Sequence, residues 1–241
     1  METLFEDRYS RQITLLGKKN QKKLFKSRVC IIGCGAIGSV VASMLVRAGI
    51  GFVRIIDRDI VELSNLHRIE LFAEGDVGES KALAAKERLG KINSECEIEA
   101  LEDDIMKDVS LLGNVDLVID CTDNIETRYL INKFCMENNV PWIYGAAIGS
   151  EGMSASFHSK PCFRCLFTKN TKSSVLGSCE ALGVLAPAPH IIGSWQAMEA
   201  IKILTGKPDF GVLLHFSLGK EPGFRFSRIK QNSKCPVCKN F

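Results

Sequence analysis

Residues 28–57 read RVCIIGCGAIGSVVASMLVRAGIGFVRIID, and this stretch decides the fold. A short apolar run at 29–32 predicts a buried parallel strand. The glycine-rich loop at 33–38 follows at once, and apolar residues then recur at helical spacing until Gly49. A second apolar run at 52–57 predicts another buried strand. The stretch therefore predicts a strand–helix–strand unit with parallel strands and a right-handed crossover.

The rest of the chain continues this alternation of strands and helices. The other predicted elements are strands at 115–120 and 142–147, helices at 79–92, 124–138 and 191–204, late antiparallel strands at 212–218 and 224–229, and a long loop rich in helix breakers at 163–189. We therefore expect an α/β fold with a doubly wound, mostly parallel sheet and C-terminal antiparallel strands. One domain over 1–241 is expected, with a Rossmann-like nucleotide-binding half at about 27–148.

Composition excludes several classes of protein. The 241 residues carry a net charge of only +3, which favours neither nucleic acid nor an anionic membrane as partner. No apolar run approaches the roughly 20 residues of a membrane span, and the mixed, acidic residues 1–7 do not resemble a secretory signal. The expected location is cytoplasmic.

The glycine loop predicts nucleotide binding. Gly33, Gly35 and Gly38 allow a tight turn, a close approach to a phosphate and close packing of the helix on the strand. The N-terminus of that helix offers free N–H groups to an anion. Asp57 ends the second strand, at the spacing where a carboxylate meets ribose hydroxyls. The motif does not distinguish NAD from ATP, and a tight turn that binds nothing is the other interpretation.

Two Cys-x-x-Cys pairs predict a metal site. Cys162 with Cys165, and Cys235 with Cys238, offer four thiolates, which suit a tetrahedral and structural zinc ion. Such a site would tie the C-terminal tail to the middle of the chain. A redox pair or buried thiols are the alternatives, and the duplicated spacing argues against both.

Several segments together resemble the MoeB/ThiF/HesA family, which is related to ubiquitin-activating enzymes. They are the glycine loop, RYSRQI at 8–13, DRDIVELSNLHR at 57–68, GESK at 78–81, DCTDN at 120–124, both cysteine pairs, Cys179-Glu180 and GSWQAMEA at 193–200. The resemblance implies a symmetric homodimer that binds ATP and Mg²⁺ in each half. It also implies that the enzyme adenylates the C-terminal glycine carboxylate of a small ubiquitin-like or sulfur-carrier protein ending in Gly-Gly, and releases pyrophosphate. Residues 149–241 would then form the carrier-binding and zinc half.

The resemblance also implies the site residues. Those assigned to ATP are Gly33, Gly35, Ala36, Gly38, Asp57, Asp59, Ser64, Asn65, Arg68, Lys81, Asp123 and Asn124. Arg68 and Lys81 would hold the phosphates, and Asp123 would ligate Mg²⁺. Arg11 would reach the ATP of the neighbouring subunit, as an arginine finger does. Cys179 would attack the activated carrier or take part in sulfur transfer.

Each of these roles has a plainer alternative. Arg68, Lys81 and Arg11 could be solvated surface cations. Asp123 could be the N-cap of the helix that follows, with Glu126 completing a capping box. Cys179 could be a buried small hydrophobe.

The chemistry favours the adenylation hypothesis over two rivals. A terminal carboxylate has a pKa of about 3.5, so it is already an anion and needs only positioning and charge neutralisation to approach a phosphate. An NAD-dependent oxidoreductase would need a hydride-transfer acid or base, which the sequence does not reveal. A non-catalytic scaffold would have no reason to keep the phosphate-binding cations. No rhodanese-like extension follows the last cysteine pair, so any sulfur donor is expected to be a separate protein.

Overall fold

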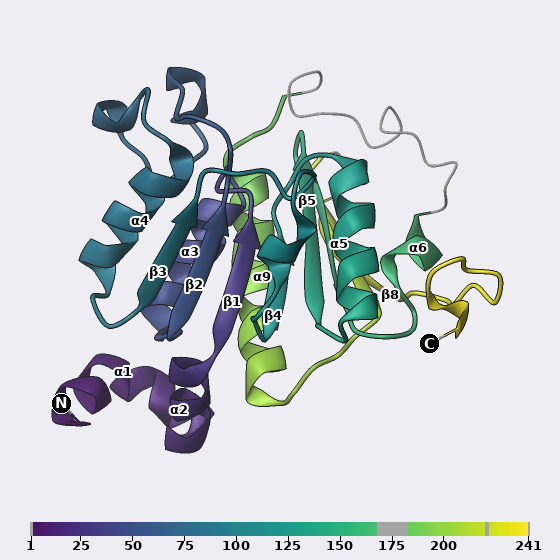
Figure 1. The fold of residues 1–241 in the computed structure, drawn as a ribbon, viewed down its shortest axis with the longest axis horizontal. Coiled ribbons are helices and arrows are strands. Elements are labelled where there is room, and N and C mark those ends of the chain that lie inside the picture. The colour runs from purple at the N-terminus through teal and green to yellow at the C-terminus, as the bar shows by residue number, and fades with distance from the viewer. Residues whose placement is uncertain (1, 168–182, 220–221, 241) are drawn as a thin grey trace.

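The structure is a computed structural model that describes residues 2–167, 183–219 and 222–240. Within these ranges, eight strands form one sheet in the order β3-β2-β1-β4-β5-β6-β7-β8 (Figure 1). The strands are β1 (Arg28–Ile32), β2 (Phe52–Ile56), β3 (Glu97–Leu101), β4 (Leu117–Asp120), β5 (Trp142–Ile148), β6 (Glu151–Phe157), β7 (Val212–Ser217) and β8 (Gly223–Arg228). Strands β1 to β5 pair in parallel, which confirms the predicted mostly parallel sheet, and β5 to β8 pair antiparallel, which confirms the predicted antiparallel character of the C-terminal strands.

Helices cover both faces of the sheet, and Figure 1 shows α5 in front and α9 behind. The helices are α1 (Glu2–Leu16), α2 (Lys18–Lys26), α3 (Gly38–Ala48), α4 (Lys81–Ile92), α5 (Ile125–Glu137), α6 (Phe163–Leu166) and α9 (Pro187–Thr205). One buried cluster joins the sheet to α3, α4 and α9, and a second joins it to α5 and α6. In the described parts of the chain, none of the helices combines the length and apolar character that a bilayer crossing requires.

The strand order indicates a crevice at the carboxyl ends of the central parallel strands. Ile32, the last residue of β1, pairs with Ile56 on one side and with Asp120 on the other. The chain runs outward from β1 to β2 and β3, and then returns to place β4 on the opposite side of β1. In open α/β sheets, ligands bind outside the carboxyl ends of the strands where the order reverses in this way. The fold therefore predicts a site beyond the ends of β1 and β4.

The structure departs from the predicted elements at several places. Strand β6 was missed because its sequence, EGMSASF, is built from small and polar residues and has no apolar run. Strand β3 was missed because EIEAL carries two glutamates, which an edge strand tolerates. Helix α9 begins at Pro187 rather than at residue 191, because a proline fits the first turn of a helix.

Candidate nucleotide-binding site

A cavity of about 420 Å³ lies beyond the carboxyl ends of β1, β2 and β4. That volume is within the range of small-molecule sites. Ten of the twelve residues that the resemblance assigns to ATP line it: Gly33, Gly35, Ala36, Asp57, Asp59, Asn65, Arg68, Lys81, Asp123 and Asn124. Gly38 and Ser64 are absent from the lining. The structure thus gathers four separate segments of the sequence around one space, although their roles there stay predictions.

The glycine loop has the geometry of a phosphate cradle. Gly33 adopts a φ of +84°, and its N–H donates to the carbonyl of Ile56 at 2.9 Å, which fixes the turn at the end of β1. A Cβ at Gly38 would lie 1.9 Å from the Gly33 carbonyl oxygen, so only glycine allows α3 to begin so close to the strand. A Cβ at Gly35 would meet nothing within 4 Å, although Gly35 lines the cavity. The loop therefore leaves open space where an anion could approach the backbone.

Asp57 braces this loop from the end of β2. Its Oδ2 accepts the N–H of Cys34 at 2.6 Å, and its Oδ1 accepts the N–H of Asp59 at 2.8 Å. The side chain is buried, and burial raises the pKa of the Asp57 carboxyl although both backbone hydrogen bonds lower it. Sequence reasoning identified the carboxylate but not this bracing contact. The ribose contact of Asp57 stays a prediction.

Two cations line the cavity from the segment between β2 and α4. Lys81 is the first residue of α4, its side chain is only 11% exposed, and its Nζ lies 3.1 Å from Oδ2 of Asp59. The alternative of a solvated surface lysine is therefore wrong for Lys81. Arg68 is partly buried and donates to the carbonyl of Ser64 at 2.8 Å. That bond holds Arg68 against the single helical turn at Leu63–Asn65.

The turn after β4 bears on the two roles that the sequence allows for Asp123, which are Mg²⁺ ligand and helix N-cap. Asn124, not Asp123, is the N-cap of α5, because its Oδ1 accepts the N–H of Thr127 at 2.8 Å. The alternative that Asp123 caps the helix is therefore wrong. Asp123 is exposed and lines the cavity, and no hydrogen bond or ion pair holds its carboxylate within the described ranges. A carboxylate at this position is a suitable ligand for Mg²⁺.

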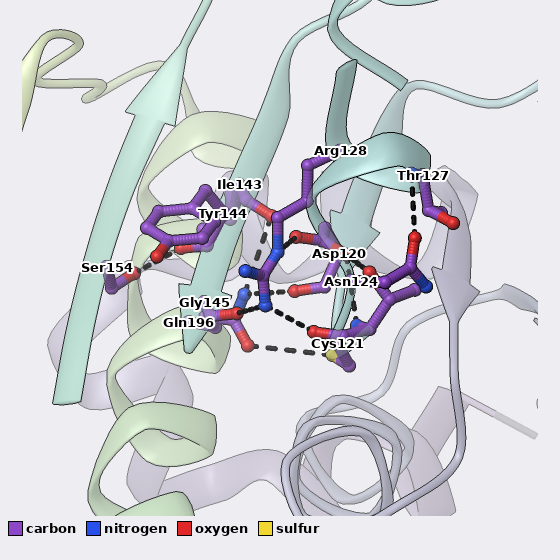
Figure 2. Close-up of polar contacts among 11 residues, drawn as sticks. Asp120, Cys121, Asn124, Thr127, Arg128, Ile143, Tyr144, Gly145, Ser154 and Gln196 are labelled. Carbon is purple, nitrogen blue, oxygen red and sulfur yellow. Dashed lines mark hydrogen bonds and ion pairs between the residues drawn. The ribbon is translucent and has the colours of Figure 1, made fainter. Parts of the chain in front are cut away.

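Sequence reasoning missed Arg128 and Gln196, which surround the same turn (Figure 2). Arg128 is buried, lines the cavity and forms an ion pair with Asp120, with 3.2 Å between Nε and Oδ2. Burial raises the pKa of the Asp120 carboxyl, while the Arg128 guanidinium opposes that shift. Arg128 follows the Asn124 cap by one helical turn. That spacing is the signal that could have directed attention to it.

Arg11 lies outside the cavity of its own chain. It is exposed on α1, and Figure 1 shows α1 below the amino ends of the strands, whereas the cavity lies beyond the carboxyl ends. Arg11 can therefore serve this kind of site only in another copy of the chain. Its role in trans stays a prediction.

The two cysteine pairs meet in one cluster, as predicted. The four Sγ atoms of Cys162, Cys165, Cys235 and Cys238 lie within 4.8 Å of one another, with separations of 3.6 Å between Cys162 and Cys235 and 3.4 Å between Cys165 and Cys238. A zinc ion with bonds of about 2.3 Å to four thiolates places the sulfurs about 3.8 Å apart, so the donor set fits zinc. Cys179 and Glu180 lie outside the described residues.

The chain is similar to known adenylyltransferases over almost its whole length. It matches the ThiF family over residues 9–238. It is 38% identical to the sulfur carrier protein adenylyltransferase of Thermus thermophilus, covering 96% of this chain and 90% of the relative. It is also 38% identical to the sulfur carrier protein ThiS adenylyltransferase of Bacillus subtilis, covering 96% of this chain and 71% of the relative.

Longer relatives and solved structures complete the comparison. The adenylyltransferase and sulfurtransferase MOCS3 of Xenopus laevis is 39% identical over 97% of this chain, which spans only 53% of that relative. The crystal structure of E. coli MccB with ATP has a TM-score of 0.83 at 24% identity, covering 96% of this chain and 74% of that one, which shows a shared fold. The family match and these relatives agree with the motifs, and the chain belongs to the ThiF family.

Proposed function

We propose that this enzyme adenylates the C-terminal glycine carboxylate of a small ubiquitin-like or sulfur-carrier protein, using ATP and releasing pyrophosphate. The observation that carries the proposal is the single cavity in which the glycine loop, Arg68, Lys81 and Asp123 meet at the switch point of the sheet. The names of the Thermus thermophilus and Bacillus subtilis relatives support a sulfur carrier as the second substrate.

The residues of the cavity suit this reaction. A carboxylate oxygen of the carrier attacks the α-phosphorus of ATP, and the bond from that phosphorus to the bridging oxygen of pyrophosphate breaks. The nucleophile is already ionised, so the obstacle is repulsion between anions. Lys81 and Arg68 supply fixed positive charge beside the cavity, and the open backbone at Gly35 supplies N–H donors for phosphate oxygens. No general base is required.

Asp123 would hold Mg²⁺ at this site. Since Asn124 caps α5, the Asp123 carboxylate is left at the cavity wall and is not committed to the helix. Bound Mg²⁺ would neutralise charge on the triphosphate. Asn65, Asp57 and Asp59, which also line the cavity, would orient the nucleotide.

The proposed enzyme is a homodimer in which Arg11 completes the partner's site. Arg11 is exposed and remote from its own cavity, as a residue that acts in trans must be. The cysteine cluster would hold a structural zinc ion that ties residues 235–238 to the start of α6. Zinc of this kind stabilises the fold and takes no part in the reaction. The product would pass to Cys179 or to a separate sulfur donor.

Intact-mass measurement on candidate carriers tests the proposal. Proteins with a ubiquitin-like fold and a Gly-Gly C-terminus are incubated with enzyme and Mg·ATP, and one of them should gain an AMP adduct. Lys81→Met should reduce adduct formation by about 100-fold or more, because it removes a fixed charge at the phosphates. Lys91→Met on the same helix is the control, since Lys91 is exposed and pairs with Glu87. Binding of NADH in place of ATP would contradict the proposal.

A further inference from the structure

The DCTDN segment that carries Asp123 is held from both faces of the sheet. Its first four residues, 120–123, run from the last residue of β4 into the segment before α5, and we call them the 120–123 turn. We propose that Arg128 and Gln196 are positioning residues, which clamp this turn so that the Asp123 carboxylate faces the nucleotide. The inference rests on the proposed function, because it assigns Asp123 to the metal of that reaction.

Arg128 holds the turn from the α5 side. Its Nε pairs with Oδ2 of Asp120 at 3.2 Å, and one of its terminal nitrogens donates to the carbonyl of Thr122, the residue before Asp123. The same nitrogen lies 3.5 Å from the carbonyl of Gly145 on β5, and the guanidinium carbon lies 5.0 Å from the centre of the Tyr144 ring. One planar group therefore bridges the turn to the neighbouring strand, which a point charge does not do.

Gln196 holds the turn from the α9 side. Its side chain is completely buried, and its Nε2 donates to the carbonyl of Asp120 at 2.9 Å and lies 3.4 Å from the carbonyl of Ile143. Its Oε1 accepts a weak hydrogen bond from the thiol of Cys121, with 3.6 Å between the two atoms. Gln196 comes from the GSWQAMEA segment, one of the segments that carry the family resemblance. Figure 2 shows both side chains reaching the end of β4 from different helices.

Asp120 joins the two halves of the clamp. Its Oδ1 accepts both the N–H of Thr122, at 3.0 Å, and the Thr122 hydroxyl, at 2.6 Å. Its Oδ2 accepts from Arg128, and its backbone carbonyl accepts from Gln196. Every oxygen of this buried residue is thus used to fix the path of the chain up to Thr122. Asp123 follows directly, so the direction of its side chain depends on hydrogen bonds that the preceding residues make.

The glycine loop depends on the same turn. A Cβ at Gly33 would lie 3.0 Å from the carbonyl oxygen of Cys121, and one at Gly38 would lie 3.3 Å from the Cβ of Cys121. The backbone of the 120–123 turn therefore packs directly on the loop. A shift of the turn would disturb both the metal ligand and the phosphate cradle, and positioning errors of about 1 Å can reduce catalysis by about 100-fold.

The test measures how much Mg²⁺ tightens ATP binding to the full chain. Titration calorimetry gives the Kd of ATP in EDTA and in MgCl₂, and the ratio of the two is the Mg²⁺ advantage. Asp123→Asn should bring this ratio close to one. Arg128→Lys keeps a positive charge beside Asp120 but cannot also bridge the carbonyls of Thr122 and Gly145. It should therefore reduce the Mg²⁺ advantage by about 10-fold or more, beyond any weakening of the Kd in EDTA that a shifted phosphate cradle causes.

Controls separate positioning from folding and from the proposed function. Lys133→Met, on the exposed side of α5, should keep the wild-type ratio. Gln196→Met applies the same test without changing any charge, and it replaces Arg128→Lys if that variant has a lowered Tm. A wild-type Mg²⁺ advantage in both clamp variants would overturn the inference and leave the proposed function intact. Failure of the wild-type enzyme to bind ATP would overturn the proposed function itself.

Discussion

The Asp57 carboxylate accepts the backbone N–H of Cys34 at 2.6 Å and so ties the end of β2 to the glycine loop. Beyond the pairing of the two strands themselves, this hydrogen bond links the segments that follow β1 and β2, where the cavity opens. The same carboxylate accepts the N–H of Asp59, whose side chain pairs with Lys81. Asp57 thus connects the phosphate cradle to one of the cations proposed to act on the phosphates.

The burial of Asp57 predicts a pH dependence of stability. Because burial raises the pKa of Asp57 in the folded state, the folded protein binds more protons at this residue than the unfolded chain does. The stability that this residue contributes is therefore fully present below its ordinary pKa of about 3.9, and is lost as the pH rises through the raised value. Urea unfolding of wild type and Asp57→Asn should show the wild type losing stability relative to the variant as pH rises. A constant difference would show that the pKa is not raised.

Gly38 and Gly35 of the loop should respond differently to alanine. Gly38→Ala places a Cβ 1.9 Å from the Gly33 carbonyl oxygen, so we expect a loss of about 1–3 kcal/mol in the free energy of unfolding. Gly35→Ala meets no atom within 4 Å, so its stability should stay within about 0.5 kcal/mol of wild type. The new methyl group would occupy the cradle, however, and ATP binding should weaken by about 10-fold or more. Urea unfolding and calorimetry with Mg·ATP check both variants, and normal ATP binding by Gly35→Ala would exclude a phosphate at the loop.

Substitution of Asn124 should lower stability, whereas substitution of Asp123 should lower activity. Asn124→Ala removes the cap of α5 and should destabilise the protein by about 1 kcal/mol. Asp123→Asn removes a carboxylate that holds nothing in the described fold, so Tm should be unchanged while carrier-dependent pyrophosphate exchange is lost. If Asp123→Asn keeps its activity and loses stability instead, Asp123 is a structural residue.

The cysteine cluster predicts one bound zinc per chain. Elemental analysis of purified protein should find it, and a strong chelator should lower Tm because zinc binding contributes directly to folding. Cys235→Ser should lose the metal, whereas Cys96→Ser should retain it, because Cys96 lies outside the cluster. A metal-free protein with an unchanged Tm would contradict a structural zinc site.

Arg11 acting in trans predicts that two inactive variants rescue each other. A mixture of Arg11→Ala and Asp123→Asn chains forms heterodimers in which one site has both residues intact. With random mixing, pyrophosphate exchange should recover to about a quarter of the wild-type rate. The absence of any recovery, at concentrations where subunits exchange, would place Arg11 outside the reaction.

Much of the fold was predictable because periodicity and glycine positions are local signals. The apolar runs that became β1, β2 and β5 are buried in the sheet, and Gly49 and Gly206 end α3 and α9 in the left-handed conformation. Strand β6 was not predictable in this way. Its small residues suit a strand between two neighbours and under α9, as at Gly152, where a Cβ would meet Phe216 at 2.5 Å and Ile192 at 2.6 Å.

The sequence motifs predicted many of the residues that line the cavity, but not the residues that tertiary packing brings to it. Ten of the residues that the motifs assign to the nucleotide line one cavity, and the four cysteines of the two pairs come together. The choice between Asp123 and Asn124 as the cap depends on backbone geometry, which composition does not reveal. Gln196 gains its importance from a residue distant in sequence, since it contacts Asp120 across 76 positions, and Arg128 joins the nearby Asp120 and Thr122 to Gly145 on another strand. Only the folded structure shows these contacts.

A crystal structure of the enzyme with Mg²⁺ and a non-hydrolysable ATP analogue tests the proposed nucleotide site most directly. The triphosphate should lie over residues 33–38, with Lys81 and Arg68 at its oxygens and the metal on Asp123. A triphosphate bound elsewhere, or an adenine nucleotide whose phosphates point away from Asp123, would contradict it.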